Sequence, residues 1–262
     1  MYFGGVDLGS LTAKAVIISD GSIACRAIMP AGYKSGETAT RVMEQCLSSV
    51  GLKLPDIAYI VSTGYGRINV PFAHKQITEI TCHAKGANFI WPAARTVIDI
   101  GGQDSKAMSI DETGRVKDFV MNEKCAAGTG RFLEVMAHAL EVDLDDFGSL
   151  SITSKDPARI SSMCTVFAES EVISNIAGGL PKQDIIAGIH DAITSRVASM
   201  ARRVSITDEV VLTGGVSKNI GVVTALEKNL GHRILVSELS QLAGALGAAL
   251  LAREAHEKEQ KG

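Results

Sequence analysis

The amino-acid sequence predicts an α/β protein built from two duplicated lobes, and three observations lead to this prediction. Residues 98–107 align without a gap on residues 6–15, and four of the ten positions are identical. In both copies a short apolar strand runs into a glycine turn and then into a second strand-like stretch. Strands and helical patterns alternate along the rest of the chain. Its 262 residues are enough for two modest domains that each bury a core.

The first lobe is assigned to residues 1–91, because the repeat begins again soon after them. Its strands are short apolar runs that end at glycine turns, and its helices have apolar residues three and four apart. The predicted elements are two strands within 6–18, strands at 22–29 and 57–61, and helices at 36–50 and 75–91. The C-terminal helix, within 241–262, is expected to complete this lobe.

The second lobe is assigned to residues 92–240 and opens with the second copy of the repeat. After it the sequence is mainly helical, with one strand–turn–helix unit near its end. The predicted elements are a strand at 116–121, helices that run to 140 and 176, a helix at 184–206, strands at 209–213 and 234–236, and a helix at 218–230. The closing helix, predicted at 241–256, is the one assigned to the first lobe.

Composition and charge exclude several function classes. The net charge is -3 and no basic stripe occurs, so nucleic acid is not an expected partner. The chain begins without a basic segment before its first acid, Asp7, which argues against a secretory signal. Its longest uncharged apolar stretch, 239–252, is too short to span a bilayer. The expected location is therefore the cytoplasm, with no membrane partner.

Three glycine turns that follow strands predict a nucleotide site. Glycine lets backbone N–H groups approach phosphate oxygens, and an aspartate at the end of a strand can hold Mg²⁺ through its waters. Asp7 and Asp99 precede the first two turns, and Gly214–Gly215 forms the third, before a helix. On the first turn Ser10, Thr12 and Lys14 add hydrogen-bond donors and one positive charge. Neither a Walker loop nor a dinucleotide-binding glycine motif is present.

The three turns resemble the phosphate-1, phosphate-2 and adenosine motifs of the actin, hexokinase and heat-shock-chaperone ATPases. This resemblance implies two ribonuclease H-like lobes around a cleft for ATP or ADP with Mg²⁺. The catalytic residues that it implies are Asp7, Asp99, Gln103 and Asp104. The ATP-binding residues that it implies are Gly9, Ser10, Thr12, Ala13, Lys14, Gly101, Gly102, Gly214, Gly215, Lys218, Asn219 and Gln241.

Two of the five cysteines lie in sequence contexts that favour metal binding. Cys125 and Cys164 each come shortly before a predicted helix, where unpaired N–H groups stabilise a thiolate. A [4Fe–4S] cluster usually needs four cysteines, so a twofold dimer would supply two from each chain. Cys25, Cys46 and Cys82 lie in apolar strand and helix patterns and are interpreted as packing residues.

The two cysteine motifs, N-x-K-C-A-A-G-T-G-R-F and C-T-V-F-A-E-S-E, closely resemble those of the activator (component A) of 2-hydroxyacyl-CoA dehydratases. S-T-G-Y-G-R, D-I-G-G-Q-D-S-K and T-G-G-V-S-K-N extend the resemblance over nearly the whole chain. The wider family includes the benzoyl-CoA reductase ATPase subunits of BadF/BadG/BcrA/BcrD type. It implies that Cys125 and Cys164 ligate one [4Fe–4S] cluster per homodimer.

The resemblance also implies partners and a direction of electron flow. Ferredoxin or flavodoxin would reduce the cluster, and ATP hydrolysis would drive the electron on to an iron–sulfur dehydratase or reductase of component D type. Two alternatives come from the same ATPase superfamily: a small-molecule kinase and an actin-like structural ATPase. A kinase needs an acid beside a substrate hydroxyl and has no use for paired helix-end cysteines. The identity of the partner enzyme and of its acyl-CoA substrate is not encoded in these motifs.

Overall fold

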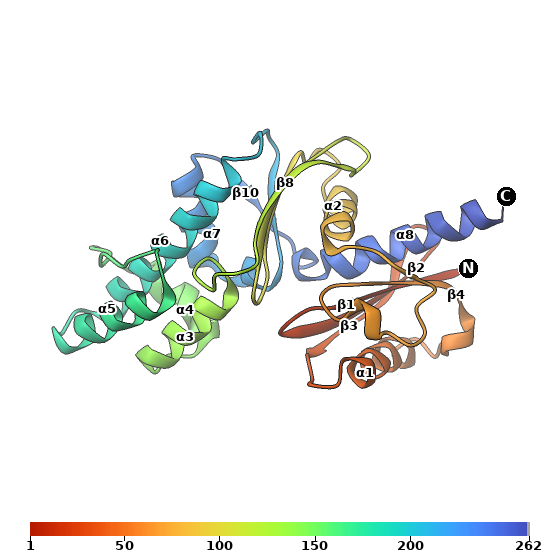
Figure 1. Cartoon of the computed structure of the whole chain (residues 1–262), viewed down its shortest axis with the longest axis horizontal. Helices are drawn as coiled ribbons and strands as arrows, with labels where there is room; N and C mark the ends of the chain where they lie inside the picture. The colour runs from red at the N-terminus through yellow and green to blue at the C-terminus, as the bar shows by residue number, and fades with distance from the viewer. Residues whose placement is uncertain (261–262) are drawn as a thin grey trace. The chain divides into compact units, whose positions relative to one another are not determined.

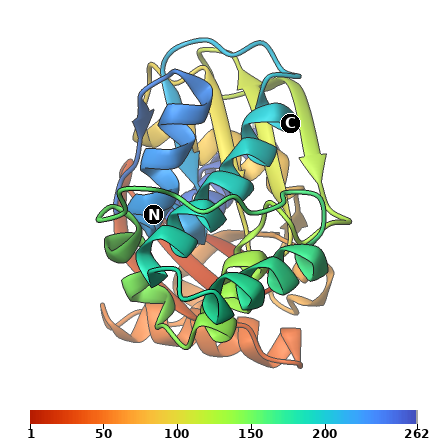
Figure 2. The same ribbon diagram turned by 90° about the vertical axis from the view of Figure 1, so that its left-hand side faces the viewer.

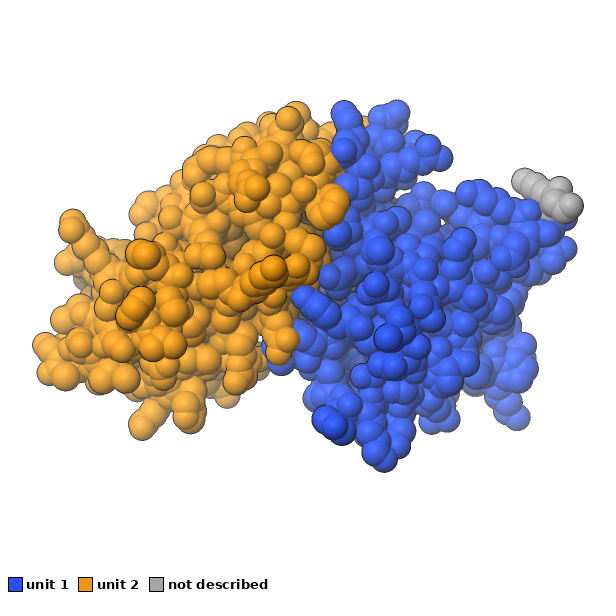
Figure 3. Space-filling model, in the orientation of Figure 1, with its two compact units in different colours: residues 1–94, 110–117, 237–262 blue, residues 95–109, 118–236 orange. Residues whose placement is uncertain are grey.

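A computed structural model describes residues 1–260 and divides them into two compact units, coloured separately in Figure 3. Unit 1 consists of residues 1–94, 110–117 and the chain from 237 onwards. Unit 2 consists of residues 95–109 and 118–236. Each unit contains one five-stranded sheet and its own buried core.

Unit 1 is a sheet with helices on both faces (Figure 1). The strand order is β3-β2-β1-β4-β5, in which β1 pairs antiparallel with β2 and parallel with β4. Successive residues of β2 alternate between the faces, since Ala15 and Ile17 pack with α1, whereas Val16 and Ile18 pack with α8. The elements are β1 (Tyr2–Leu8), β2 (Thr12–Ser19), β3 (Ser22–Pro30), α1 (Ser35–Ser48), β4 (Ile57–Thr63), β5 (Lys75–Gln76), α2 (Glu79–Ile90) and α8 (Ala243–Glu259).

Unit 2 repeats the β1–β2 hairpin of unit 1 with two strands of its own and adds a layer of helices. Its strand order is β10-β9-β6-β7-β8, with β6 antiparallel to β7 and parallel to β9. The helices pack on Ile98, Ile100 and Leu212 in one core, and Figures 1 and 2 show them together on one side of the strands. The elements are β6 (Thr96–Ile100), β7 (Ser105–Ile110), β8 (Val116–Asn122), α3 (Gly130–Leu140), α4 (Leu144–Ser151), α5 (Thr165–Ala177), α6 (Lys182–Ala201), β9 (Val210–Thr213), α7 (Ile220–Leu230) and β10 (Ile234–Leu235).

Most predicted elements are present, and two differences have clear physical causes. The helix predicted over 75–91 begins only at Glu79, because Lys75 and Gln76 pair with β4 as the short strand β5. The helix α4 was not predicted at all, although Asp143 caps its start by accepting from the Asp145 N–H at 3.1 Å. Within residues 1–260, no helix is both long enough and apolar enough to cross a bilayer.

Candidate functional site

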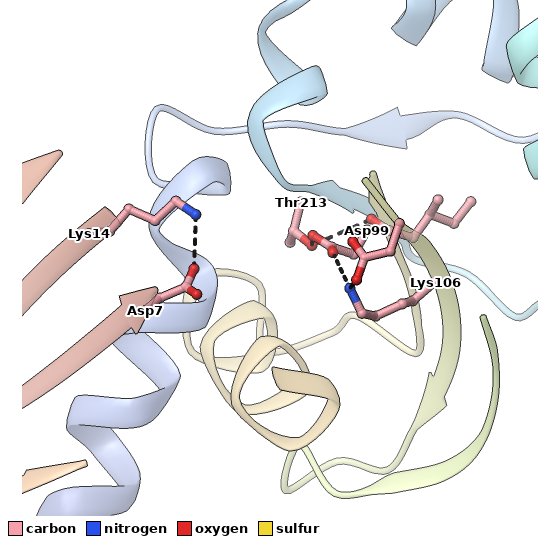
Figure 4. Close-up of polar contacts among 7 residues, drawn as sticks. Asp7, Lys14, Asp99, Lys106 and Thr213 are labelled. Atoms are coloured by element: carbon pink, nitrogen blue, oxygen red, sulfur yellow. Dashed lines mark hydrogen bonds and ion pairs between the residues drawn. The ribbon is translucent and has the colours of Figure 1, made fainter. Parts of the chain in front are cut away.

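The first copy of the repeat forms a hairpin whose aspartate and lysine face each other. β1 and β2 pair so that Asp7 lies opposite Lys14, and Lys14 Nζ is 3.0 Å from Asp7 Oδ2 (Figure 4). Asp7 is 3% exposed, whereas the Lys14 side chain is 12% exposed. The turn between the strands is closed by the Gly9 N–H, which donates to the Thr12 carbonyl at 3.1 Å. The ion pair thus holds the Lys14 ammonium next to the glycine turn at Gly9.

The second copy forms the same hairpin in the same register. Asp99 lies opposite Lys106, and the Lys106 ammonium is 3.3 Å from Asp99 Oδ2 (Figure 4). Here Lys106 has a second acid, because its Nζ is 2.7 Å from Asp104 Oδ2. All three side chains are almost fully buried. The turn is closed by the Gly101 N–H, which donates to the Asp104 carbonyl at 2.9 Å.

A threonine–glycine pair from the neighbouring parallel strand lies beside each aspartate. Thr63 of β4 is in register with the first aspartate, and Thr213 of β9 with the second. The glycines that follow, Gly64 and Gly214, have φ values of +85° and +88°. A Cβ on either would lie 2.5 or 2.9 Å from Oδ1 of its aspartate, so only glycine fits. In the sequence these neighbours are marked by a Thr-Gly dipeptide, which recurs at residues 63–64 and 213–214.

Asn219, which is predicted to bind ATP, makes side-chain hydrogen bonds within unit 2. Its Oδ1 accepts from the Val222 N–H at 3.1 Å and caps α7, while its amide lies 3.2 Å from His190 Nε2. The other ring nitrogen lies 2.8 Å from the Ser151 hydroxyl, which itself donates to the Gly148 carbonyl. Since the asparagine amide can only donate, Nε2 accepts and Nδ1 carries the proton. Burial lowers the pKa of His190 to about 4, which keeps this ring neutral.

The remaining residues predicted to bind ATP differ in how accessible they are. The Ala13 side chain belongs to the core of unit 1. Gln241 is 8% exposed and its Oε1 is buried without a hydrogen-bond partner. Ser10, Thr12, Gly101 and Gly102 are half-buried, and Gln103, Gly215 and Lys218 are exposed. Gly215 and Lys218 are the first and last residues of a 3₁₀ turn that separates the third glycine turn from α7.

The two cysteines predicted to ligate a cluster are half-buried and both lie in unit 2. Cys164 is the N-cap residue of α5, as predicted. Cys125 is not at the start of a helix, because α3 begins at Gly130 with Thr129 as its N-cap residue. Asn122 holds the Cys125 backbone instead: its amide donates to the Cys125 carbonyl at 2.8 Å, and its Oδ1 accepts from the Cys125 N–H at 3.3 Å.

The start of α3 is bonded directly to the second glycine turn. The Gly130 N–H donates to the Gly101 carbonyl, and the Arg131 N–H donates to the Gly102 carbonyl, each at 2.8 Å. These are N–H groups of the first helical turn, which have no partner inside a helix. The loop that carries Cys125 is therefore anchored, through five residues of chain, to a turn predicted to bind phosphate.

The other three cysteines are buried in unit 1. The Cys46 thiol lies 3.0 Å from Cys25 Sγ, and burial raises the pKa of both thiols. Burial also raises the pKa of Cys82, to about 12. Thiols in this state are poor metal ligands and poor nucleophiles. Within residues 1–260, no three His, Cys, Asp or Glu side chains gather as a metal site.

Comparison with known proteins gives matches over nearly the whole chain. The model of the BadF/BadG/BcrA/BcrD ATPase family matches residues 5–252. The (R)-2-hydroxyglutaryl-CoA dehydratase activating ATPase of Acidaminococcus fermentans is 49% identical, over 96% of this chain and 97% of its own. The structure of the activator of the 2-hydroxyisocaproyl-CoA dehydratase from Clostridium difficile with bound ADPNP is 46% identical. It superposes with a TM-score of 0.95 and covers 100% of this chain and 97% of its own.

A more distant structure shows the breadth of the fold. The ROK family glucokinase from Streptomyces griseus, in complex with glucose and AMPPNP, is 14% identical. It matches with a TM-score of 0.59 over 97% of this chain and 100% of its own. At this identity the likeness concerns the fold alone, and it confirms the predicted hexokinase-like architecture.

Proposed function

Because this chain belongs to the BadF/BadG/BcrA/BcrD ATPase family, we propose that it is an ATP-hydrolysing iron–sulfur activator of a 2-hydroxyacyl-CoA dehydratase or a related CoA-ester reductase. The observation that carries this proposal is the near-complete match, at 46% and 49% identity, to two proteins named as dehydratase activators. The activator would accept an electron from ferredoxin or flavodoxin and pass it to the partner enzyme at low potential.

The two hairpins support the ATP part of the proposal. Each offers a glycine turn for phosphate oxygens, with a carboxylate at the end of the preceding strand. Asp7 and Asp99 would hold Mg²⁺ through its waters, while Lys14 offers a positive charge that is partly open to solvent. Gln103 is exposed on the second turn, and we propose that it helps to orient the attacking water. The buried and unpartnered Oε1 of Gln241 would accept a hydrogen bond from the nucleotide.

The cysteines support a cluster shared between two copies of the chain. A [4Fe–4S] cluster supplies one-electron chemistry at low potential and is usually held by four thiolates. Cys125 and Cys164 provide two half-buried thiols in one unit, so the residues present fit half of such a site. A homodimer would complete it, since twofold symmetry brings the same residues together from both chains.

The surface of α5 next to Cys164 supports the same homodimer. Met163, Val166, Phe167 and Ile173 are between 55% and 77% exposed, although all four are apolar. Such a run of exposed apolar side chains is typical of an interface rather than of a surface in contact with water. A second copy of α5 would cover it and would place the partner's thiols beside Cys164.

The hydrogen bonds at the start of α3 support coupling between nucleotide and cluster. If phosphate binding displaces the turn at Gly101 and Gly102, the two N–H groups of α3 that bond to it must follow or break. The Cys125 loop ends at these same residues, so its position would depend on the nucleotide. A hinge or loop movement set by nucleotide contacts is a common form of such switching.

The state of the cysteines supports a location in the cytoplasm. All five are free thiols, and free thiols are typical of that compartment.

The proposal is tested by measuring iron content and ATP turnover in one set of anaerobically purified variants. Cys125→Ala and Cys164→Ala should lose iron and the absorbance near 400 nm, whereas the buried control Cys46→Ala should keep both. Asp7→Asn and Asp99→Asn should lower ATP turnover about 10²- to 10³-fold and leave the cluster spectrum unchanged.

Two results would contradict the proposal: full iron retention in both Cys125→Ala and Cys164→Ala, or unchanged hydrolysis in the Asp7→Asn/Asp99→Asn double variant. The coupling is tested on the wild-type protein by following extraction of iron by a chelator. The rates should differ between ADP and ATP, and equal rates would remove the link between nucleotide and cluster.

A further inference from the structure

One arginine of unit 2 contacts both of the loops that carry Cys125 and Cys164. Arg196 projects from the middle of α6, and its Nη1 donates to the carbonyl of Ser162 at 3.2 Å. Ser162 is two residues before Cys164. The aliphatic stem of the same arginine lies against Gly128, which is three residues after Cys125. The closeness is shown by the distance of 3.3 Å that would separate a Cβ on Gly128 from Arg196 Cδ. The head and the stem of one side chain therefore contact different loops.

The backbone of the first loop requires a glycine at position 128. Gly128 has a φ of +112°, which strains any other residue. A side chain there would also meet the amide of Asn122, whose own hydrogen bonds hold the Cys125 backbone. Arg196 thus packs on the same short segment whose Cys125 backbone is held by Asn122.

A pocket at the end of β8 and along α6 shows the charge around this contact. It has a volume of about 510 Å³, and Asn122, Ser162, Arg196 and Arg203 are among its lining residues. The lining includes two arginines and no aspartate or glutamate. No acidic side chain of the lining therefore neutralises the Arg196 guanidinium.

We propose that Arg196 is a positioning residue that fixes the Cys125 and Cys164 loops relative to each other and keeps a positive charge beside their thiolates. This inference rests on the proposed function, in which both thiolates ligate an anionic cluster. An arginine suits this role because its rigid fork stays charged while its stem packs on apolar surface. A cation close to the cluster also favours its reduced, more negative state.

The first measurement needs no cluster. In the iron-free protein, alkylation of Cys125 and Cys164 by iodoacetamide is followed by mass spectrometry in the wild type and in R196Q, R196K and R203Q. R196Q removes the donor to Ser162 and shortens the stem that lies against Gly128, so both loops should be released. At a pH that ionises the thiols in every variant, both should therefore react about tenfold faster, which corresponds to about 1.4 kcal/mol. R203Q removes a charge from the same pocket without a contact to either loop, and its rates should match the wild type.

The second measurement uses the reconstituted holoprotein. R196Q should lose iron to a chelator faster than the wild type, and its reduction potential should shift to more negative values. A tenfold change in that equilibrium equals about 59 mV for one electron. R196K retains the charge and the stem on Gly128 but lacks the Nη1 donor to Ser162. It should therefore keep the wild-type potential, while Cys164 is alkylated faster than in the wild type. Circular dichroism confirms that each variant keeps its helices.

The outcomes separate the two proposals. A wild-type protein that takes up no iron would overturn the cluster proposal, while the alkylation rates would still decide whether Arg196 holds the loops. If the wild type takes up iron and R196Q equals it in alkylation and iron loss, the positioning role of Arg196 is wrong. If R196Q and R196K shift the potential equally, the contribution of charge is wrong.

Discussion

The two Asp–Lys hairpins share a register but differ in how the lysine charge is balanced. In both units an aspartate at the end of a strand faces the lysine seven residues later. In unit 1 Lys14 has one acidic partner, and 12% of its side chain is exposed. In unit 2 Lys106 has two acidic partners, Asp99 and Asp104, and is 2% exposed.

This difference indicates that the duplicated hairpins have different tasks. By formal charge the first hairpin is neutral, whereas the second carries one surplus negative charge. A surplus negative charge beside a glycine turn favours a divalent cation, and an accessible lysine favours phosphate. The sequence repeat therefore preserves the backbone conformation of the hairpin, whereas single residues beside it, such as Asp104, set the net charge of the hairpin.

The largest expected effect comes from removing each lysine. Lys106→Met leaves two carboxylates buried without their cation, which should cost about 3–5 kcal/mol of local stability. Lys14→Met leaves one buried carboxylate and removes one charged hydrogen bond. Because the lysine position is 12% exposed, water can approach that carboxylate, so the cost should be about 1.5–3 kcal/mol. Hydrogen exchange of the strand amides reports each unit separately. Equal losses in β1 and β6 would show that the two hairpins are equivalent.

A second expected effect concerns pH and is confined to unit 2. The pKa of His190 falls from its ordinary value of 6.5 to about 4 through burial, so the unfolded state binds a proton that the folded state does not. Its contribution is fully present above pH 6.5 and is lost as the pH falls toward 4, by about 3 kcal/mol. Protonation would also break the hydrogen bond from Asn219 to Nε2.

The His190→Gln variant isolates this effect, because glutamine does not titrate in this range. Hydrogen exchange of α6 and α7 is compared between pH 7 and pH 4.5 in the wild type and in the variant. The wild-type amides should lose more protection than those of the variant, and α1 in unit 1 serves as the internal reference. The same loss in both proteins would mean that other groups cause the pH dependence.

Much of the hairpin geometry follows from the sequence, whereas its surroundings do not. The seven-residue spacing of Asp7 and Lys14, repeated at Asp99 and Lys106, fixes a cross-strand pair as soon as a two-strand hairpin is predicted. The threonines beside the two aspartates, Thr63 and Thr213, come from parallel strands far along the chain. Parallel pairing is set by tertiary packing and leaves no short-range pattern.

The error in the helix start near Cys125 has a different origin, because a local signal marks the true start. Cys125 was placed at a helix start, yet Thr129 is the residue type that favours an N-cap, and Gly128 precedes it with a positive φ. By the capping preferences the helix boundary belongs at Thr129, four residues after Cys125. Arg196 offers no such signal, since it lies inside a long helix and reaches the loops only through the fold.

The smallest expected effect concerns the two threonines that occupy matching positions. Thr213 donates to Asp99 Oδ1 at 2.9 Å, so Thr213→Val removes a charged hydrogen bond and should cost unit 2 about 1.5–3 kcal/mol. The Thr63 hydroxyl is buried without a conventional partner and faces the Cys82 thiol, a weak donor. Thr63→Val should therefore change unit 1 by less than about 1 kcal/mol. Hydrogen exchange of β4 and β9 measures both, and a larger loss for Thr63→Val would reverse the comparison between the hairpins.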